Sequence, residues 1–360
     1  GTKTGMRALR GRRFMQLPGQ DGMTAASALV TGHRAEPELA HTAVQEALAR
    51  AGLERADNVI LFLSRDFRRH PQPAVLAAAR AAGSLSVAGC TASGLFTERG
   101  WQLDQPAAAA LVFSSPSSEV VENSPILSFT GHSRLPFEWR DDAPRAGLLD
   151  ADAVAWSHGR ATENGCADVR LPGLRNRLIV ARGLRLLCGP QTVESCQNYE
   201  LSQVGGHRAG DSLRRALPPD LRDFPPLHQI TALRHPDEPG IAILSANADG
   251  SLTLAENFNE GETVTWAIRQ PLAAEHEIRQ ALTSAVNRKK PPNFALMFSC
   301  IGRGPLFYGS DDRDLKAFRE TFPDTPLLGA YGTGQIAPLA GRNRLFHNTA
   351  LTLLFESTHV

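Results

Sequence analysis

One segment of this chain occurs twice, roughly 240 residues apart. The first copy contains NVILFLS (58–64) and ALVFSS (110–115), and the second contains NFALMFS (293–299) and LTLLFES (351–357). Between these strand-like runs, each copy has a helix-like run and then a strand that leads into a segment of the form Gly-x-x-x-x-Gly. A duplicated strand–helix–strand unit predicts two lobes built alike, whose glycine segments lie at corresponding places and face a common cleft.

Apolar patterns within the copies predict helices that alternate with buried strands. A helix is expected over Glu38–Ala51, and the continuous apolar run Val59–Leu63 indicates a strand covered on both faces. A second helix over 73–82 precedes a strand at Leu85–Ala88. The second copy repeats this order, with helices near 278–285 and 314–322 and strands at 294–298 and 326–328. We expect a mixed α+β fold of the α/β type: two pseudo-repeated lobes, mixed sheets packed together, and helices outside.

Between the copies the sequence favours antiparallel structure. Asp249-Gly250 separates two apolar runs, 240–246 and 252–256, and predicts a hairpin. Thr263–Arg269 alternates like a half-buried strand. The proline-rich segment 217–227 is interpreted as a connector between the lobes. The expected divisions are a flexible tail or cloning remnant at 1–22, an N-terminal lobe at 23–195 and a C-terminal lobe at 196–360.

Composition and charge exclude several classes of function. The 360 residues are 42% hydrophobic and 21% charged, which suits a globular protein with a large core. The net charge of +1 gives no basis for a nucleic-acid or membrane partner. No apolar run approaches the ~20 residues that a membrane-spanning helix needs. A cytoplasmic protein is the expectation.

The cysteines indicate neither a disulfide framework nor a zinc site. They are odd in number and include no Cys-x-x-Cys pair: Cys90, Cys166, Cys188, Cys196 and Cys300. Free thiols fit a reducing compartment, and no metal site is predicted.

Candidate ligand-binding residues follow the strands of both copies. Ligands of α/β sheets gather beyond the carboxyl ends of strands, where backbone N–H groups are free. Arg303 could bind an anion, its flanking glycines allow close backbone approach, and Tyr331 could form a wall. The predicted site comprises Gly89, Cys90, Thr91, Ser93, Gly94, Cys300, Gly302, Arg303, Gly304, Gly329, Tyr331, Gly332, Gly334 and Gln335. A purely structural role, with glycines in tight turns and the arginine paired locally, fits the same pattern.

Two other chemistries stay open. Cys300 could act as a nucleophile with His347 as its base, but no acyl-transfer motif surrounds it. Haem or metal ligation by one of the eleven histidines lacks a supporting Cys-x-x-Cys-His or His-x-x-x-His spacing. The glycine segments match neither a dinucleotide fingerprint nor a Walker loop. No catalytic residue and no cofactor are therefore predicted, and haem stays an alternative.

An ordered set of motifs resembles the FIST family, named after F-box and intracellular signal transduction proteins. The resemblance covers most of the chain from about residue 25, and it assigns a FIST N-like lobe to 23–195 and a FIST C-like lobe to 196–360. Its motifs are VILFLS (59–64), VAGCTASG (87–94), NYELSQVGGHRAGDSLRRAL (198–217), AILSANADGSLTLAENFNEGETV (242–264), FSCIGRG (298–304), PLLGAYGTGQIAP (326–338) and FHNTALTLLF (346–355).

The resemblance implies a non-catalytic sensor that binds a small ligand, such as an amino acid, and signals through a partner such as a kinase. Some relatives are reported to bind haem and sense nitric oxide, which gives the alternative. Family segments commonly read Gly-Glu-Ile after the last glycine, whereas this chain has Leu95 and Gln335 at those positions. If the missing carboxylates hold an ammonium group in relatives, this chain prefers another ligand or has lost that role.

Overall fold

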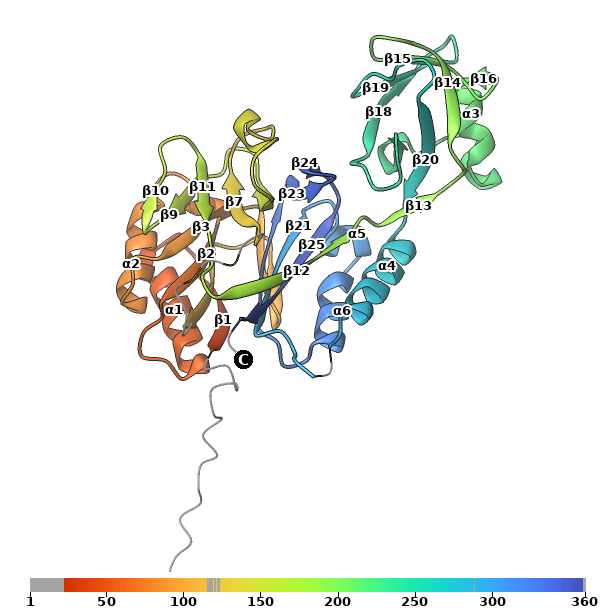
Figure 1. Cartoon of the computed structure of the whole chain (residues 1–360). Coiled ribbons are helices and arrows are strands. Elements are labelled where there is room, and N and C mark those ends of the chain that lie inside the picture. Colours follow the sequence, from red (N-terminus) through yellow and green to blue (C-terminus); the bar gives the residue numbers. More distant parts are fainter. Residues whose placement is uncertain (1–22, 115–118, 120, 122–123, 288, 359–360) are drawn as a thin grey trace, which may run out of the picture.

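Two six-stranded mixed sheets, packed face to face, form the main body of the protein (Figure 1). The computed structural model describes residues 23–114, 119, 121, 124–287 and 289–358, so the tail predicted at 1–22 lies outside the described residues. The first sheet has the order β1 (Thr24–Thr31), β6 (Ala107–Ser114), β2 (Asn58–Ser64), β3 (Val87–Ala92), β9 (Ala155–Ser157) and β10 (Arg160–Ala161).

The second sheet repeats the arrangement of the first four strands. Its order is β12 (Leu174–Ala181), β25 (Ala350–Ser357), β21 (Phe294–Cys300), β22 (Leu327–Gly332), β4 (Gly94–Thr97) and β5 (Gly100–Gln102). In each sheet the two central strands are parallel, β2 with β3 and β21 with β22, and two antiparallel strands follow on one side. The duplication seen in the sequence is therefore a structural repeat.

Helices cover the outer face of each sheet, because every central strand carries apolar residues on both faces. Val59, Leu61 and Leu63 of β2 pack against α1 (Pro37–Ala51) and α2 (Gln72–Ala82). Both helices end at a glycine with positive φ, Gly52 and Gly83. On the second sheet the corresponding helices are α4 (Pro271–Ser284) and α6 (Arg313–Thr321), with the short α5 (Pro305–Tyr308) nearby.

The opposite faces of the sheets form a shared aromatic core. Phe62 of β2 meets Phe298 of β21 edge-on, with ring centroids 6.2 Å apart. Phe113 of β6 stacks on Phe294 of β21 at 4.9 Å. All four side chains are fully buried. Since burying one such side chain stabilises a protein by about 1.5–3 kcal/mol, this interface holds the two halves together.

A third sheet joins segments from both halves. Its order is β11 (Cys166–Val169), β7 (Ile126–Thr130), β8 (Arg145–Leu149), β23 (Gly334–Leu339) and β24 (Arg342–Phe346). Strand β23 follows β22 directly in the chain but pairs with β8 of the first half. Conversely, β4 follows β3 but pairs with β22 of the second half. The halves thus exchange strands where each glycine segment lies.

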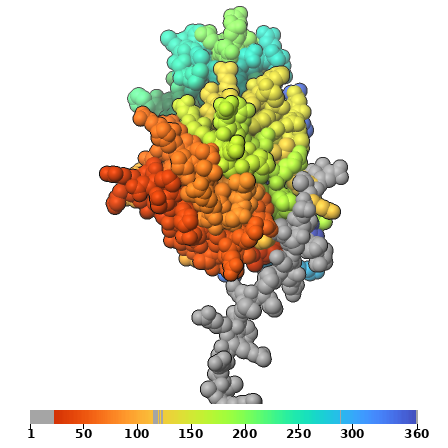
Figure 2. Space-filling model, turned by 90° about the vertical axis from the view of Figure 1, so that its left-hand side faces the viewer, coloured from red at the N-terminus to blue at the C-terminus, as the bar shows by residue number. Residues whose placement is uncertain are grey.

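The segment between β12 and α4 forms a small closed barrel that projects from the body (Figures 1 and 2). Its ring of six strands is β20 (Thr263–Arg269), β14 (Gln191–Gln197), β15 (Glu200–Val204), β19 (Leu252–Leu254), β18 (Ile241–Ala246) and β17 (Ile230–Leu233), which pairs again with β20. Strands β13 (Leu184–Leu186) and β16 (His207–Arg208) and helix α3 (Ala209–Ala216) complete it.

The barrel confirms the predicted hairpin and the strand Thr263–Arg269 but corrects the interpretation of the proline-rich segment. Residues 217–227 lie between α3 and β17, inside the barrel unit, and do not link the halves. The predicted lobe boundary at 195/196 falls within β14 and stays a prediction. The predicted fold class, mixed α+β with pseudo-repeated halves, packed sheets and outer helices, is confirmed.

Candidate functional site

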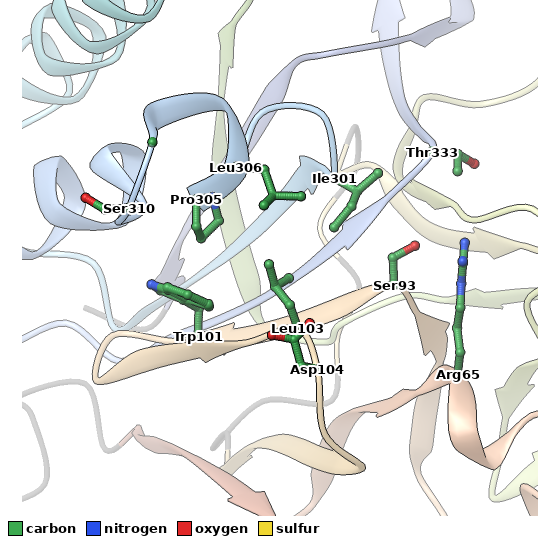
Figure 3. A pocket seen from close by; sticks show the side chains of 11 residues that line it. Arg65, Ser93, Trp101, Leu103, Asp104, Ile301, Pro305, Leu306, Ser310 and Thr333 are labelled. Carbon is green, nitrogen blue, oxygen red and sulfur yellow. The ribbon is translucent and has the colours of Figure 1, made fainter.

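A cavity of about 540 Å³ opens where the two halves exchange strands. Its size falls within the ~300–1,000 Å³ of typical small-molecule sites. Both halves contribute to its lining, as Figure 3 shows. The lining residues are Arg65, Ser93, Trp101, Leu103, Asp104, Ile301, Pro305, Leu306, Gly309, Ser310 and Thr333.

Four of these residues are two pairs of structural equivalents. Arg65 and Ile301 each follow the first parallel strand of a half, β2 or β21. Ser93 and Thr333 each follow the second, β3 or β22. The carboxyl ends of the parallel strands in both halves thus converge on one cavity, which is where α/β proteins gather ligands. One residue of each glycine segment, Ser93 and Thr333, lines this cavity, whereas the glycines of the segments do not.

The expectation that the glycine segments are loops with free N–H groups is wrong. Residues 89–92 continue β3 and residues 329–332 continue β22, and Ser93 and Thr333 are one-residue junctions to the next strand. The Ser93 N–H donates to the Tyr331 carbonyl at 3.0 Å, and the Thr333 N–H donates to the Leu149 carbonyl at 2.9 Å. Sheet pairing therefore takes the backbone donors that a ligand was expected to use.

The glycines serve close packing of the crossing strands. A Cβ at Gly329 would lie 2.1 Å from the ring of Phe96, and one at Gly89 would lie 1.8 Å from the Leu61 carbonyl oxygen. Gly94, Gly332, Gly334 and Gly304 are crowded in the same way, with neighbouring atoms at 2.4–2.7 Å. At Gly89 and Gly329 the paired strand, its backbone or its aromatic ring, leaves no room for a side chain.

An ion pair between an exposed arginine and a buried aspartate lies at one end of the cavity. The Nε and Nη2 groups of Arg65 donate to the two carboxylate oxygens of Asp150, at 3.2 and 2.9 Å. Ser93 Oγ donates to Asp150 Oδ1 at 2.9 Å. Asp150 is fully buried, whereas the Arg65 side chain is 43% exposed. Burial raises the pKa of Asp150, and the hydrogen bonds from Arg65 and Ser93 oppose that rise. The pair holds the Arg65 guanidinium in a fixed orientation at the cavity wall.

Apolar side chains form the other end. Trp101 and Leu103 come from β5 and the residues after it, and Pro305 and Leu306 come from α5. The Trp101 indole N–H donates to Asp311 Oδ1 at 3.1 Å, which fixes the plane of the ring. This wall is built from one segment of each half.

Arg303 has a structural role in place of the predicted anion site. It is 1% exposed and does not line the cavity. Its Nε and Nη2 groups donate to Asp314 at 2.7 and 3.1 Å, and Nη1 donates to the Ala181 carbonyl at 3.0 Å. Tyr308 Oη also donates to Asp314, at 2.6 Å. The guanidinium is therefore occupied by a buried carboxylate, and the local-pairing interpretation describes it.

Tyr331 and Gln335 point into the core, away from the cavity. Tyr331 is fully buried, stacks obliquely on Phe96 at 4.8 Å and donates its hydroxyl to Asp312. Gln335 is also fully buried and donates to the Ser299 carbonyl at 3.0 Å. Leu95, the other position that departs from the family pattern, packs in the central core. Neither departure lies at the cavity, so the inference of an altered ligand preference from them loses its basis.

The two cysteines of the predicted site are buried. Burial raises the pKa of Cys90 well above its usual value, and Asp150 raises it further. Its neighbour Thr91 is fully buried and accepts the Val154 N–H at 3.0 Å. Cys300 is 5% exposed and its thiol donates to Asn348 Oδ1 at 3.6 Å. His347 contacts the Thr333 carbonyl through Nδ1 at 2.9 Å, and within the described residues no hydrogen bond joins it to Cys300.

Of the predicted ligand-binding residues, Ser93 is the one found among the described residues that line the cavity. Sequence reasoning missed Arg65, Trp101 and the residues of α5. The duplication itself carried a usable signal for Arg65, because it follows β2 as Ile301 follows β21. No comparable signal pointed to Trp101, whose strand joins the sheet of the other half.

Neither a metal cluster nor a membrane-spanning helix occurs in the part of the chain that the structure describes. There, no three or more His, Cys, Asp or Glu side chains gather as a metal site would require. The described helices are too short or too polar for any to cross a bilayer.

The fold and the cavity define a class of protein: two duplicated α+β halves that enclose a cavity of small-molecule size, with a barrel attached. The model of the FIST C domain matches residues 209–338, so this part of the chain carries a FIST C domain, as the resemblance to the FIST family predicted. This family is associated with small-ligand binding and signal transduction.

Curated relatives cover part of the chain. Uncharacterised proteins of Mycobacterium tuberculosis and Mycobacterium bovis are 29% and 30% identical over 206 residues, 53% of this chain. Human F-box only protein 22 is 28% identical over 96 residues, 26% of this chain and 24% of that protein. The chain spans about half the length of the mycobacterial relatives, 54% and 53%.

Proposed function

We propose that this protein is a non-catalytic sensor that binds a small molecule in the cavity between its halves and passes that occupancy to a signalling partner. The observation that carries the proposal is the convergence of Arg65, Ser93, Ile301 and Thr333 on one cavity. A duplicated scaffold that brings equivalent strand ends together, and leaves space between them, supports a binding site better than a packing role.

Two contacts support transmission from the cavity to the barrel. Arg269, the last residue of barrel strand β20, donates to the Gly302 carbonyl at 2.5 Å. Its guanidinium also lies over the ring of Phe307, 5.1 Å from the centroid. Gly302 and Phe307 belong to the segment 301–309, which contributes Ile301, α5 residues and Gly309 to the cavity. A ligand that moves this segment would act on the root of the barrel.

A ligand screen tests the proposal. Thermal unfolding would be followed against amino acids, other metabolites and haem, because a ligand that binds only the folded state raises the unfolding temperature. Any hit would then be measured on Leu306→Arg, which blocks the cavity, and on Leu272→Arg, a control on α4. Both leucines are 75% exposed, so the two changes carry similar costs in stability. Loss of binding in the first variant only supports the proposal; equal binding in both refutes this cavity as the site.

The alternatives keep their own tests. A haem sensor requires an axial ligand, and the described lining residues include no histidine or cysteine. A Soret band in protein expressed with haem supplied would nevertheless establish that function. A Cys300 enzyme requires a thiol that reacts rapidly with iodoacetamide at neutral pH, whereas a buried structural thiol reacts slowly.

A further inference from the structure

The two ends of the cavity differ in chemistry. Arg65, Ser93 and Thr333 lie at one end, and Trp101, Pro305 and Leu306 lie toward the other, as Figure 3 shows. A cavity with a cationic end and an apolar end fits a ligand with a matching anionic group and apolar body.

The polar end is prepared for an anion. Asp150 holds the Nε and Nη2 edge of Arg65, and within the described part of the chain the Nη1 group makes no hydrogen bond. The Ser93 hydroxyl donates to Asp150, and the Thr333 hydroxyl donates to the Leu149 carbonyl at 3.4 Å while it accepts the Ala151 N–H at 3.1 Å. Arg65 therefore supplies the free donors at this end. A guanidinium already oriented by a buried carboxylate loses little side-chain freedom when it binds an anion.

The apolar end has the shape of a slot. Trp101 and Leu103 form its lower side and Pro305 and Leu306 its upper side in Figure 3. Since the hydrogen bond to Asp311 fixes the indole plane, Trp101 offers a flat surface opposite the proline. Flat, rigid walls favour a planar ring, which stacks on an indole with about 0.5–1.5 kcal/mol beyond its area burial.

We infer that the cavity takes an aromatic monocarboxylate, whose carboxylate meets Nη1 of Arg65 and whose ring lies between Trp101 and Pro305. This inference rests on the proposed function and names the ligand class of the same cavity. Asp104, an exposed carboxylate at the cavity wall, could instead attract a cation, so the sign of the ligand charge has to be tested directly.

The experiment uses a series of defined probes. Calorimetry would compare benzoate, phenylacetate, 3-phenylpropionate and 4-phenylbutyrate, each with its primary amide and with the amine of equal length. The expected result is saturable binding that is strongest at one chain length, with the amide weaker by about tenfold and the amine weaker still. An amide or amine that binds as well as the best carboxylate overturns the inference, as does a series in which no carboxylate binds.

Matched variants distinguish a direct contact between Arg65 and the ligand from the long-range attraction of an anion to any nearby positive charge. Arg65→Gln removes the proposed contact, and Arg68→Gln removes an equal charge from an exposed neighbour outside the cavity. We expect the first to abolish the preference for carboxylate over amide and the second to change affinity less than about threefold. Since Arg65→Gln leaves the buried Asp150 carboxylate without its cation, Arg65→Gln with Asp150→Asn replaces the ion pair by two neutral side chains. A carboxylate preference that survives in the double variant contradicts the assignment.

Trp101 is tested in the same assay. Trp101→Leu keeps an apolar side chain at the wall but removes the flat indole ring. If the indole stacks on the ligand, this change should reduce the ratio of the affinity for phenylacetate to that for cyclohexylacetate, which has no planar ring. Failure of this inference is distinguishable from failure of the proposed function. If no aromatic carboxylate binds but the metabolite screen finds another ligand whose binding Leu306→Arg abolishes, the proposed sensor function is supported and the proposed ligand class is refuted. If no ligand of any class depends on Leu306, both fall.

Discussion

Asp312 provides the sharpest test of the electrostatics beneath the cavity. Its side chain is 1% exposed, caps the N-terminus of α6 by accepting the Asp314 and Leu315 N–H groups, and accepts the Tyr331 hydroxyl. Burial, and then the charge of Asp314, raises the pKa of Asp312 to about 7 in spite of these hydrogen bonds. Arg303, the nearby cation, is already paired with Asp314.

The sign of the pH dependence follows from this raised pKa. Between about pH 4 and pH 7 the folded protein keeps a proton on Asp312 that the unfolded chain releases. The contribution of this group to the free energy of unfolding is therefore present below pH 4, falls as pH rises, and is lost above pH 7. Because the pKa of Asp312 rises from its usual 3.8 to about 7, the free energy of unfolding falls by roughly 4 kcal/mol over the whole titration. Roughly 2–3 kcal/mol of this loss falls between pH 5 and pH 8.

Asp312→Asn removes the titration while its amide oxygen can still cap α6. Urea unfolding of both proteins at pH 5, 6, 7 and 8 should show the wild type losing roughly 2–3 kcal/mol relative to the variant as pH rises. Asp311→Asn changes an exposed neighbour and keeps Asp312, so this variant should lose stability with rising pH as the wild type does. A difference between wild type and Asp312→Asn that stays constant over this range, or that grows in favour of the wild type with pH, refutes the reasoning.

Three further predictions concern packing, pairing and reactivity. Gly329→Ala places a Cβ 2.1 Å from the facing phenyl ring and should cost about 1–3 kcal/mol in urea unfolding, whereas Gly100→Ala, with open space around it, should be near neutral; equal costs would contradict the packing argument. Arg303→Met leaves the carboxylate of Asp314 buried without its cation and should cost about 3–5 kcal/mol, with Asp314→Leu recovering part of it in the double variant; no recovery would count against the pairing. Cys90 should resist iodoacetamide in the folded protein and react after unfolding, as mass spectrometry of the labelled peptides would show, because burial raises its thiol pKa; rapid native labelling would disprove this.

Local sequence patterns predicted the outer helices, the central strands and their duplication. The run Val59–Leu63 is apolar on both faces because one face meets helices and the other meets the second sheet. A strand that is covered on both faces has a continuous apolar run whatever element covers it, so the sequence pattern predicts the strand. The exchange of β4 and β23 between the halves could not be predicted in this way, because the choice of pairing partner leaves the apolar pattern of a strand unchanged.

The same limit explains the site. Glycines mark places where the backbone comes close to something, but the sequence does not say whether that is a ligand or another strand. Here it is another strand, Gly329 against Phe96 and Gly89 against Leu61. Arg303 misled for a related reason: an arginine after a strand end fits an anion site, and the buried partner Asp314 is visible only once α6 is in place.

The duplication explains why the cavity has two unlike ends. Two identical halves would present the same side chain at each strand end and would form a cavity of uniform chemistry. The pair Ser93 and Thr333 keeps that likeness, a hydroxyl in each half. The pair Arg65 and Ile301 has diverged, one to a cation and the other to an apolar side chain. Ile301 lies between Leu306 and Arg65 in Figure 3, so Ile301→Arg should place a second cation beside the apolar end and reduce the selectivity for a ligand with a charged and an apolar end. If that variant keeps the selectivity, the side chains at the strand ends, such as Arg65 and Ile301, do not determine which ligand binds.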